Sequence, residues 1–245
     1  MFHHKLSDEV EGLVFLKWYM LAFLAGSINA GGFLAAGSFV THVTGFATMF
    51  GIGAANGRWD EAIGILTVPF FFLLGTMLSA YLIDYRFHRG KQPHYDWVMF
   101  LEFLCLLVVA AGGHFKKFGI FGEALKLKQD YLLLALLCLA SGLQNAAITT
   151  ASGASVRTTH LTGLTTDLGI GIVRALGYDK HPRERNAELQ ANWVRLGTII
   201  AYIGGSLIGA ALFIRLDYLG FLLPACLALY AMFQAIKEKD YLGRR

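Results

Sequence analysis

Long apolar runs separated by short polar connections dominate the chain. Eight such segments can be counted, and each approaches the roughly 20 residues that a helix needs to cross a bilayer. They cover Val14–Ala36, Phe39–Asn56, Ala62–Asp84, Trp97–Gly113, Tyr131–Ile148, Thr158–Leu176, Trp193–Ile214 and Leu219–Ala235. Because a helix satisfies its own backbone in lipid, the pattern predicts an all-α, polytopic transmembrane bundle that forms one membrane domain over residues 1–245.

The second and sixth segments differ from the others. They are rich in Thr and Gly, and each contains a histidine. They are expected either to span the membrane or to be broken or re-entrant helices, so the number of spans lies between six and eight. With eight spans and an internal N-terminus, sixteen of the 21 Lys and Arg residues lie inside; with six spans, fifteen do. The positive-inside rule therefore predicts cytoplasmic N- and C-termini in both cases and does not choose between them.

Composition supports the membrane class. The chain is 56% hydrophobic and 16% charged, with a net charge of +4. Its basic residues lie in short connections and the tail, where they act as topology signals and contact lipid head groups. No basic block is interleaved with aromatic residues, so nucleic-acid binding is not expected. The three cysteines sit singly in apolar runs and indicate packing rather than a disulfide framework.

The two halves of the chain resemble each other. Three pairs of stretches match in the same order: Ala25–Ala30 with Ser141–Ala146, Thr41–Gly51 with Thr159–Gly169, and Gly75 and Ser79 with Gly205 and Gly209. The offsets are 116, 118 and 130 residues. This predicts two internal repeats, at about residues 14–113 and 131–235, each marked by Thr-His-x-Thr-Gly. Four spans per unit would give parallel repeats, whereas three spans and a re-entrant segment would give inverted ones.

The repeated motif supplies the first candidate solute-binding residues. They are His42, Thr44, Gly45, His160, Thr162 and Gly163. The β-branched stretch ahead of each motif favours an extended chain that breaks into a helix, whose N-terminal N–H groups and dipole would face a ligand. Thr44 and Thr162 could cap that helix, and the glycines would allow close approach of backbone or ligand. The alternative is that Thr and Gly only pack helices together in lipid.

Polar residues near the motifs extend the candidate site. Asn29, Gln144 and Asn145 lie late in the first helix of each unit, where they either line the same cavity or bond neighbouring helices. Arg157 precedes the second motif and either pairs with an anion or marks the membrane boundary.

Two carboxylates fall inside apolar segments. Asp167 lies seven residues beyond His160, two helical turns away on the same face, and Glu102 lies in the fourth segment. Intramembrane carboxylates are costly, so both are candidates for proton or ion coupling. The structural alternatives are an ion pair of Asp167 with Arg157 or Arg174, and a Glu102 side chain that reaches the interface.

No enzyme motif accompanies these residues: HExxH, GxSxG, P-loop and GxGxxG patterns are absent from the sequence. We therefore expect a protein that is not an enzyme and has no cofactor. A metal site built from His42, His160 and Asp167 is conceivable if the two units face each other, but it is not the favoured interpretation.

The chain resembles the YoaK-like family of bacterial multi-pass membrane proteins of unknown function. The resemblance runs from about Phe15 to Phe233. It rests on Gly26-x-x-Asn29, Thr41–Gly45, Gly142–Ala146, and Val156–Gly163 followed by Asp167–Gly169. Family members often carry Asp at the position of Asn29 and Asn at that of Phe46, so the first repeat is less polar here. The resemblance implies a bacterial inner-membrane location and supplies no substrate.

These features favour a secondary transporter or permease for a small solute, anionic or neutral, bound at the repeat interface. The alternatives are a passive channel with the same pore, and a non-transporting sensor or lipid-binding protein. The expected partners are the lipid bilayer and a small solute or ion, and a homo-oligomer is compatible with the sequence.

Overall fold

The computed structural model describes residues 12–123, 128–153, 158–177 and 182–243. These residues form helices and connections without a β-strand, which confirms the all-α prediction for the described part. The α-helices are α1 (Gly12–Ala36), α2 (Val43–Ala55), α3 (Trp59–Ile65), α4 (Thr67–Ala80), α5 (Arg86–His88), α6 (Tyr95–His114), α7 (Lys128–Ala151), α8 (Leu161–Gly177), α9 (Pro182–Leu216) and α10 (Leu222–Gly243). A π-helical turn, η1 (Tyr81–Tyr85), follows α4, and a 3₁₀ turn, η2 (Asp217–Phe221), joins α9 to α10.

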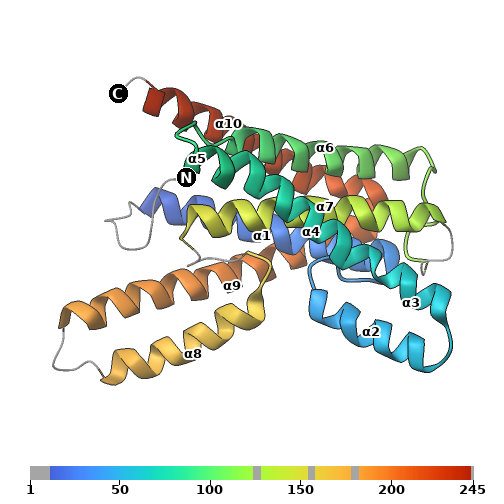
Figure 1. Cartoon of the computed structure of the whole chain (residues 1–245), viewed down its shortest axis with the longest axis horizontal. Coiled ribbons are helices and arrows are strands. Elements are labelled where there is room, and N and C mark those ends of the chain that lie inside the picture. Colours follow the sequence, from blue (N-terminus) through green and yellow to red (C-terminus); the bar gives the residue numbers. More distant parts are fainter. Residues whose placement is uncertain (1–11, 124–127, 154–157, 178–181, 244–245) are drawn as a thin grey trace.

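Five stretches are long and apolar enough to cross a membrane. They are Val14–Ala36, Ala62–His88, Tyr95–His114, Tyr131–Ala151 and Pro182–Lys239. The last stretch contains α9, η2 and α10, and Figure 1 shows that α10 turns back beside α6 instead of continuing α9. The protein is thus a multi-pass membrane protein.

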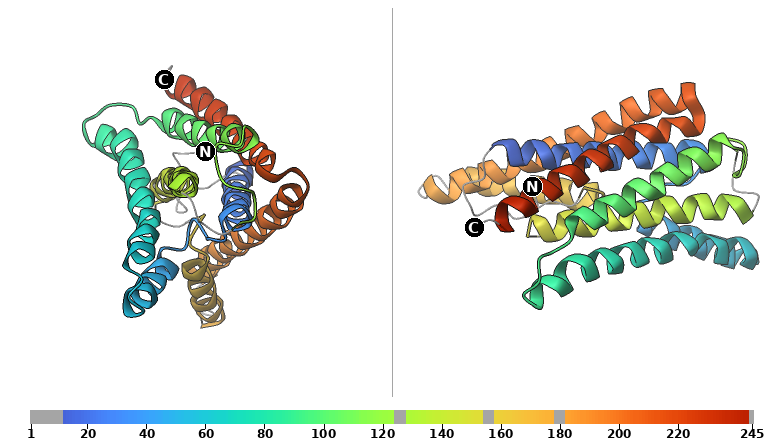
Figure 2. Two further views of the ribbon diagram at one scale, coloured as in Figure 1. Left: turned by 90° about the vertical axis from the view of Figure 1, so that its right-hand side faces the viewer. Right: turned by 90° about the horizontal axis from the view of Figure 1, so that it is seen from above.

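The helices α1 and α7 form the centre of the bundle. Figure 2 shows them enclosed by α4, α6, α9 and α10, and most of their residues are buried, in contrast to the outer spans. They run in opposite directions, as do α4 and α9 (Figure 1). The Gln144 side chain on α7 donates a hydrogen bond from Nε2 to the Leu21 carbonyl on α1, at 2.6 Å. This buried bond ties the two central helices together.

Glycines bring two pairs of helices into close contact. On α1, a Cβ at Gly26 would overlap the Tyr202 carbonyl of α9, and Gly205 of α9 meets the Phe23 carbonyl of α1 in the same way. On α7, Gly142 packs against the Phe72 carbonyl of α4. Small residues allow backbones in lipid to approach, so α1 with α9 and α4 with α7 are the tightest helix contacts described.

Ion pairs join three helices at the end of the bundle where α1 begins and α10 ends. The Lys17 ammonium lies 3.0 Å from the Glu238 carboxylate, and Lys239 lies 3.1 Å from Asp96. These pairs link α1 to α10 and α10 to α6. Their side chains are partly exposed, so each contributes about 1 kcal/mol or less.

The helices α2 and α8 stand apart from the long spans. Residues 37–42, ahead of α2, are not helical, and residues 158–160 are not helical ahead of α8. With 13 and 17 residues, α2 and α8 are about 20 and 25 Å long, less than the roughly 30 Å of bilayer hydrocarbon. Figure 1 shows that both begin near the middle of the bundle and run outward toward opposite ends.

The close contact between α1 and α9 gives a stability prediction. The variant Gly205→Ala should lower the unfolding free energy by about 1–3 kcal/mol, because its Cβ would meet the Phe23 backbone, which cannot move aside cheaply. Gly204→Ala is the matched control, since its Cβ would meet only the Phe23 ring at 3.9 Å. Thermal unfolding in detergent measures both variants, and equal stability of the two would contradict the packing described.

Candidate functional site

A cavity of about 680 Å³ lies between α4 and α7 and the beginnings of α2 and α8. Two stretches that lie 118 residues apart in the sequence meet in it. It is lined by Thr41, His42, Val43, Thr44, Phe72, Thr76, Ala80, Asp84, Asn145, Ala146, Thr149, Thr150, Thr159, His160, Leu161 and Thr162. The structure therefore places both Thr-His-x-Thr-Gly motifs at one polar cavity, whose size is typical of small-molecule sites.

Both motif helices begin at this cavity. His42 is the N-cap residue of α2, and its side chain makes no capping hydrogen bond. In the first turn of α2, the Gly45 N–H donates to the His42 carbonyl at 3.1 Å. The N–H groups of Val43 and Thr44, which precede it, have no partner within the helix. In α8, the first bond of this kind runs from the Leu164 N–H to the His160 carbonyl, at 3.2 Å. Two positive helix ends thus converge on one space.

The expected capping by Thr44 and Thr162 is wrong. Both residues lie within the first turn of their helices, where their own backbone is already helical. A capping side chain must precede the helix, and in α2 that position belongs to His42. The Thr44 and Thr162 side chains instead contribute to the cavity lining.

The two histidines have different surroundings. The His160 ring lies over Gly163, where an added Cβ would approach Nδ1, so this glycine makes room for the histidine of its own motif. Gly45 has no such role, since its nearest neighbour is the His42 Cβ at 4.0 Å. The His42 ring instead packs edge-on against Phe39, which stacks on Phe33.

The three amide side chains proposed for the site are separated by the fold. Asn145 lines the cavity, and its Oδ1 is buried without a hydrogen-bond partner in the described part of the chain. Asn29 is buried, and its Oδ1 accepts a 3.0 Å hydrogen bond from Thr41. Gln144 is also buried and bonds the α1 backbone. Only Asn145 is thus placed to contact a ligand in this cavity.

Asp84 also lines the cavity, although the sequence analysis did not predict it as a site residue. It lies in η1, and its Oδ2 accepts a hydrogen bond from the Thr150 hydroxyl on α7, at 3.1 Å. Asp84 ends the predicted third segment and therefore looked like an ordinary membrane-boundary residue. A π-helical turn rotates the following side chains relative to an α-helix and is frequent at functional sites, but no residue pattern in the chain predicts it.

The two carboxylates that were predicted lie elsewhere. Asp167 is exposed on α8 and is not among the residues that line the cavity. Glu102 is completely buried on α6, and neither carboxylate oxygen has a hydrogen-bond partner among the described residues. The expectation that its side chain could reach the interface is therefore wrong. Arg157 lies outside the described residues, as does any pairing of Asp167 with it.

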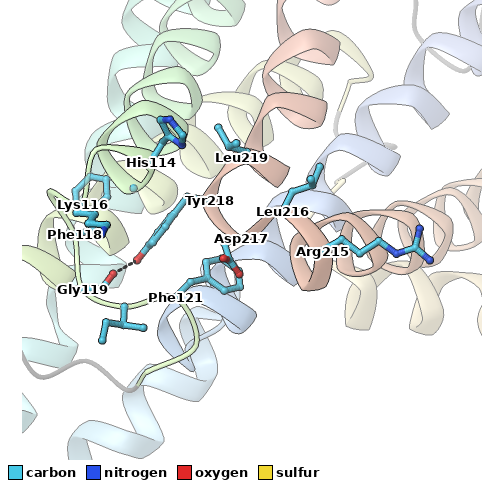
Figure 3. Close-up of a pocket in the computed structure, with 12 residues that line it drawn as sticks. His114, Lys116, Phe118, Gly119, Phe121, Arg215, Leu216, Asp217, Tyr218 and Leu219 are labelled. Atoms are coloured by element: carbon cyan, nitrogen blue, oxygen red, sulfur yellow. Dashed lines mark hydrogen bonds between the residues drawn. The ribbon is translucent and has the colours of Figure 1, made fainter.

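A second cavity, of about 690 Å³, lies at the end of the bundle opposite the beginning of α1. Figure 3 shows the Tyr218 ring between the connection after α6 and the turn after α9, with its hydroxyl donating to the Gly119 carbonyl at 2.9 Å. The Arg215 side chain extends away from this ring. Gly113 faces the Tyr218 ring so closely that a Cβ would overlap it. These contacts hold the connection against the turn.

The chain belongs to the family described as "Protein of unknown function (DUF1275)", whose model matches residues 18–234. The match agrees with the expectation of an uncharacterised family that covers nearly the whole chain, although it does not carry the name YoaK-like. No curated protein and no solved structure matches the chain.

The convergence of the two motifs predicts a cross-link. In a background without the native cysteines, Thr44→Cys with Thr162→Cys should be joined by a short bifunctional maleimide, because both positions line one cavity. A protease site between α6 and α7 then separates the halves of the chain unless they are linked, which gel electrophoresis detects. The control pairs Thr44→Cys with Ile170→Cys, an exposed position about 12 Å further along α8. Equal cross-linking of both pairs would contradict this geometry.

Proposed function

Since the family has no assigned activity, we propose that this protein is a secondary transporter, or permease, for a small solute that carries an anionic group. One observation supports this above all: both histidine motifs line the same polar cavity inside a multi-pass helical bundle. Transporters bind their solutes at such places, between helices that are interrupted near the middle of the membrane.

The helix arrangement supports two inverted repeats. The matched helices α1 and α7 run in opposite directions, as do α4 and α9, and α6 and α10 (Figure 1). The glycine contacts are reciprocal: the first helix of each unit packs against the third-segment helix of the other, α1 against α9 and α7 against α4. A twofold relation between the units produces this exchange. With α2 and α8 re-entrant, the bundle has six spans, and inverted repeats then follow from parity.

The same arrangement supports a cytoplasmic location of both termini. Helix α1 begins, and α10 ends, at the same end of the bundle (Figure 1). With six spans, fifteen of the 21 Lys and Arg residues fall on that side. The positive-inside rule then favours the cytoplasmic side of a bacterial inner membrane for this end.

The cavity offers donors for an anionic group. The N–H groups at the beginnings of α2 and α8 have no partners within their helices, and the dipole of each helix adds about half a positive charge. The His42 and His160 rings, and the Thr44 and Thr162 hydroxyls, add side-chain donors at the same place. A carboxylate or phosphate-like group would be bound by these donors together.

The histidines give the test of this proposal. In proteoliposomes that take up a radiolabelled anion-bearing solute, His42→Ala and His160→Ala should each weaken solute binding about tenfold or more, because a hydrogen bond to a charged group is lost. The control is His114→Ala at the opposite end of the bundle. Saturable uptake supports a transporter, whereas large unitary conductance supports the passive channel. Unchanged uptake in both cavity variants would refute the site.

Glu102 gives a second test, because we propose that it couples transport to protons or ions. A buried carboxyl group without partners is costly, so Glu102→Leu, which keeps the side-chain volume, should raise the unfolding free energy by about 1–3 kcal/mol. The same variant should lose the dependence of uptake on a proton or ion gradient. A stabilised variant that keeps gradient-driven uptake would contradict the coupling role.

A further inference from the structure

We propose that the solute is a small zwitterion, whose acidic group binds at the beginnings of α2 and α8 and whose basic group binds at Asp84. This inference rests on the proposed function and specifies the chemical class of the solute. It starts from the charge distribution of the cavity, which has a positive region and a negative region.

The negative region is formed by Asp84 and its neighbours. One carboxylate oxygen accepts the hydrogen bond from Thr150, and the other has no hydrogen bond within the described part of the chain. No Lys or Arg is among the described residues that line the cavity, so the lining described contains no permanent positive side chain to balance this carboxylate. Asp84 is therefore available as the counter-ion of a bound ammonium or guanidinium group.

Asn145 strengthens the case for a ligand that donates hydrogen bonds. Its Oδ1 is buried and unpartnered while the residue lines the cavity. A buried acceptor without a donor costs free energy, so rotation of the Asn145 amide toward a ligand N–H in the cavity would be favourable. Thr159, only 7% exposed, also lines the cavity and contributes a hydroxyl that can donate or accept.

The two regions lie at different depths in the bundle. Asp84 follows Thr76 by eight residues, or about 12 Å along the helix, and Thr150 follows Asn145 by about 7 Å. Figure 1 shows α5, directly after Asp84 and its turn, near the end of the bundle where α1 begins, whereas α2 and α8 begin nearer the middle. Because both regions line the same cavity, a zwitterion with a spacer between its charged groups would contact both.

Ligands with a single charge fit this cavity less well. An anion at the helix beginnings leaves the Asp84 charge unbalanced, and a cation at Asp84 leaves the free N–H groups without acceptors. The second unit has no copy of the carboxylate: the offset of 130 residues that relates Gly75 to Gly205 places Ile214 at the equivalent position. The cavity therefore has its negative charge in one region and its positive helix ends in another, as the recognition of a zwitterion requires.

Matched probes test the proposal with the purified full-length protein in detergent. Amino acids without an ionisable side chain, from α-amino acids to ω-amino acids with longer spacers, are each compared with the N-acetyl derivative, which keeps only the negative charge, and with the amide, which keeps only the positive charge. Ligand-induced rises in unfolding temperature are measured. At least one amino acid should stabilise the protein, and its two singly charged derivatives should not do so at the same concentration.

The variant Asp84→Asn should weaken binding of that amino acid about tenfold or more and abolish the preference over the N-acetyl derivative. Asp60→Asn, the same change at an exposed site in α3, should behave like the wild type. If Asp84→Asn does not fold, Thr150→Val serves instead: it should weaken binding of the amino acid and retain the preference, because the carboxylate remains.

Three results would overturn the zwitterion proposal. They are equal stabilisation of the wild type by an N-acetyl derivative, stabilisation by an amide alone, and no stabilisation by any amino acid. None of these results contradicts the proposed transport of an anion-bearing solute, which the variants His42→Ala and His160→Ala test separately. If His42→Ala and His160→Ala leave solute binding unchanged while Asp84→Asn still weakens it, the proposed anion site is refuted instead.

Discussion

The need to satisfy the backbone within lipid governs this structure. A long helix bonds its own N–H and C=O groups, but the chain is not helical at residues 37–42 and 158–160, where it enters α2 and α8. Such breaks are tolerated only where protein or a wet cavity surrounds them. Here the breaks lie beside α4 and α7 and end at a polar cavity. The breaks thus leave the first N–H groups of α2 and α8 without helical partners at the edge of this cavity.

The close glycine contacts make this arrangement rigid. Gly26 and Gly205 join α1 to α9, and Gly142 with Gly75 joins α7 to α4. Lipid gives no hydrophobic driving force between helices, so close packing of small residues must supply the association. The cavity at the beginnings of α2 and α8 lies beside one of these pairs, since α4 and α7 line it and no described lining residue comes from α1 or α9.

Residues that the sequence matches between the two halves of the chain have different surroundings. His42 packs against Phe39, whereas His160 lies over Gly163. Asn29 is paired with Thr41, whereas its counterpart Asn145 has an unpartnered oxygen at the cavity. Asp84 has Ile214 at the equivalent position. Asp84 and Asn145 thus line the cavity, whereas Asp167, a candidate for proton or ion coupling, is not among the described lining residues.

The sequence by itself determined the membrane class, the helical fold and the motif residues His42, Thr44, His160 and Thr162, because hydropathy and repetition are local properties of the chain. Tertiary structure decided which polar residues share a cavity. Asp84 and Asn145 enter it, and Asp167, Glu102, Asn29 and Gln144 do not. The physical reason is the rotation of each helix about its own axis. In a helix that is apolar on all sides, sequence spacing does not show which face meets a neighbouring helix. The π-helical turn before Arg86 further changes the direction in which the side chains point.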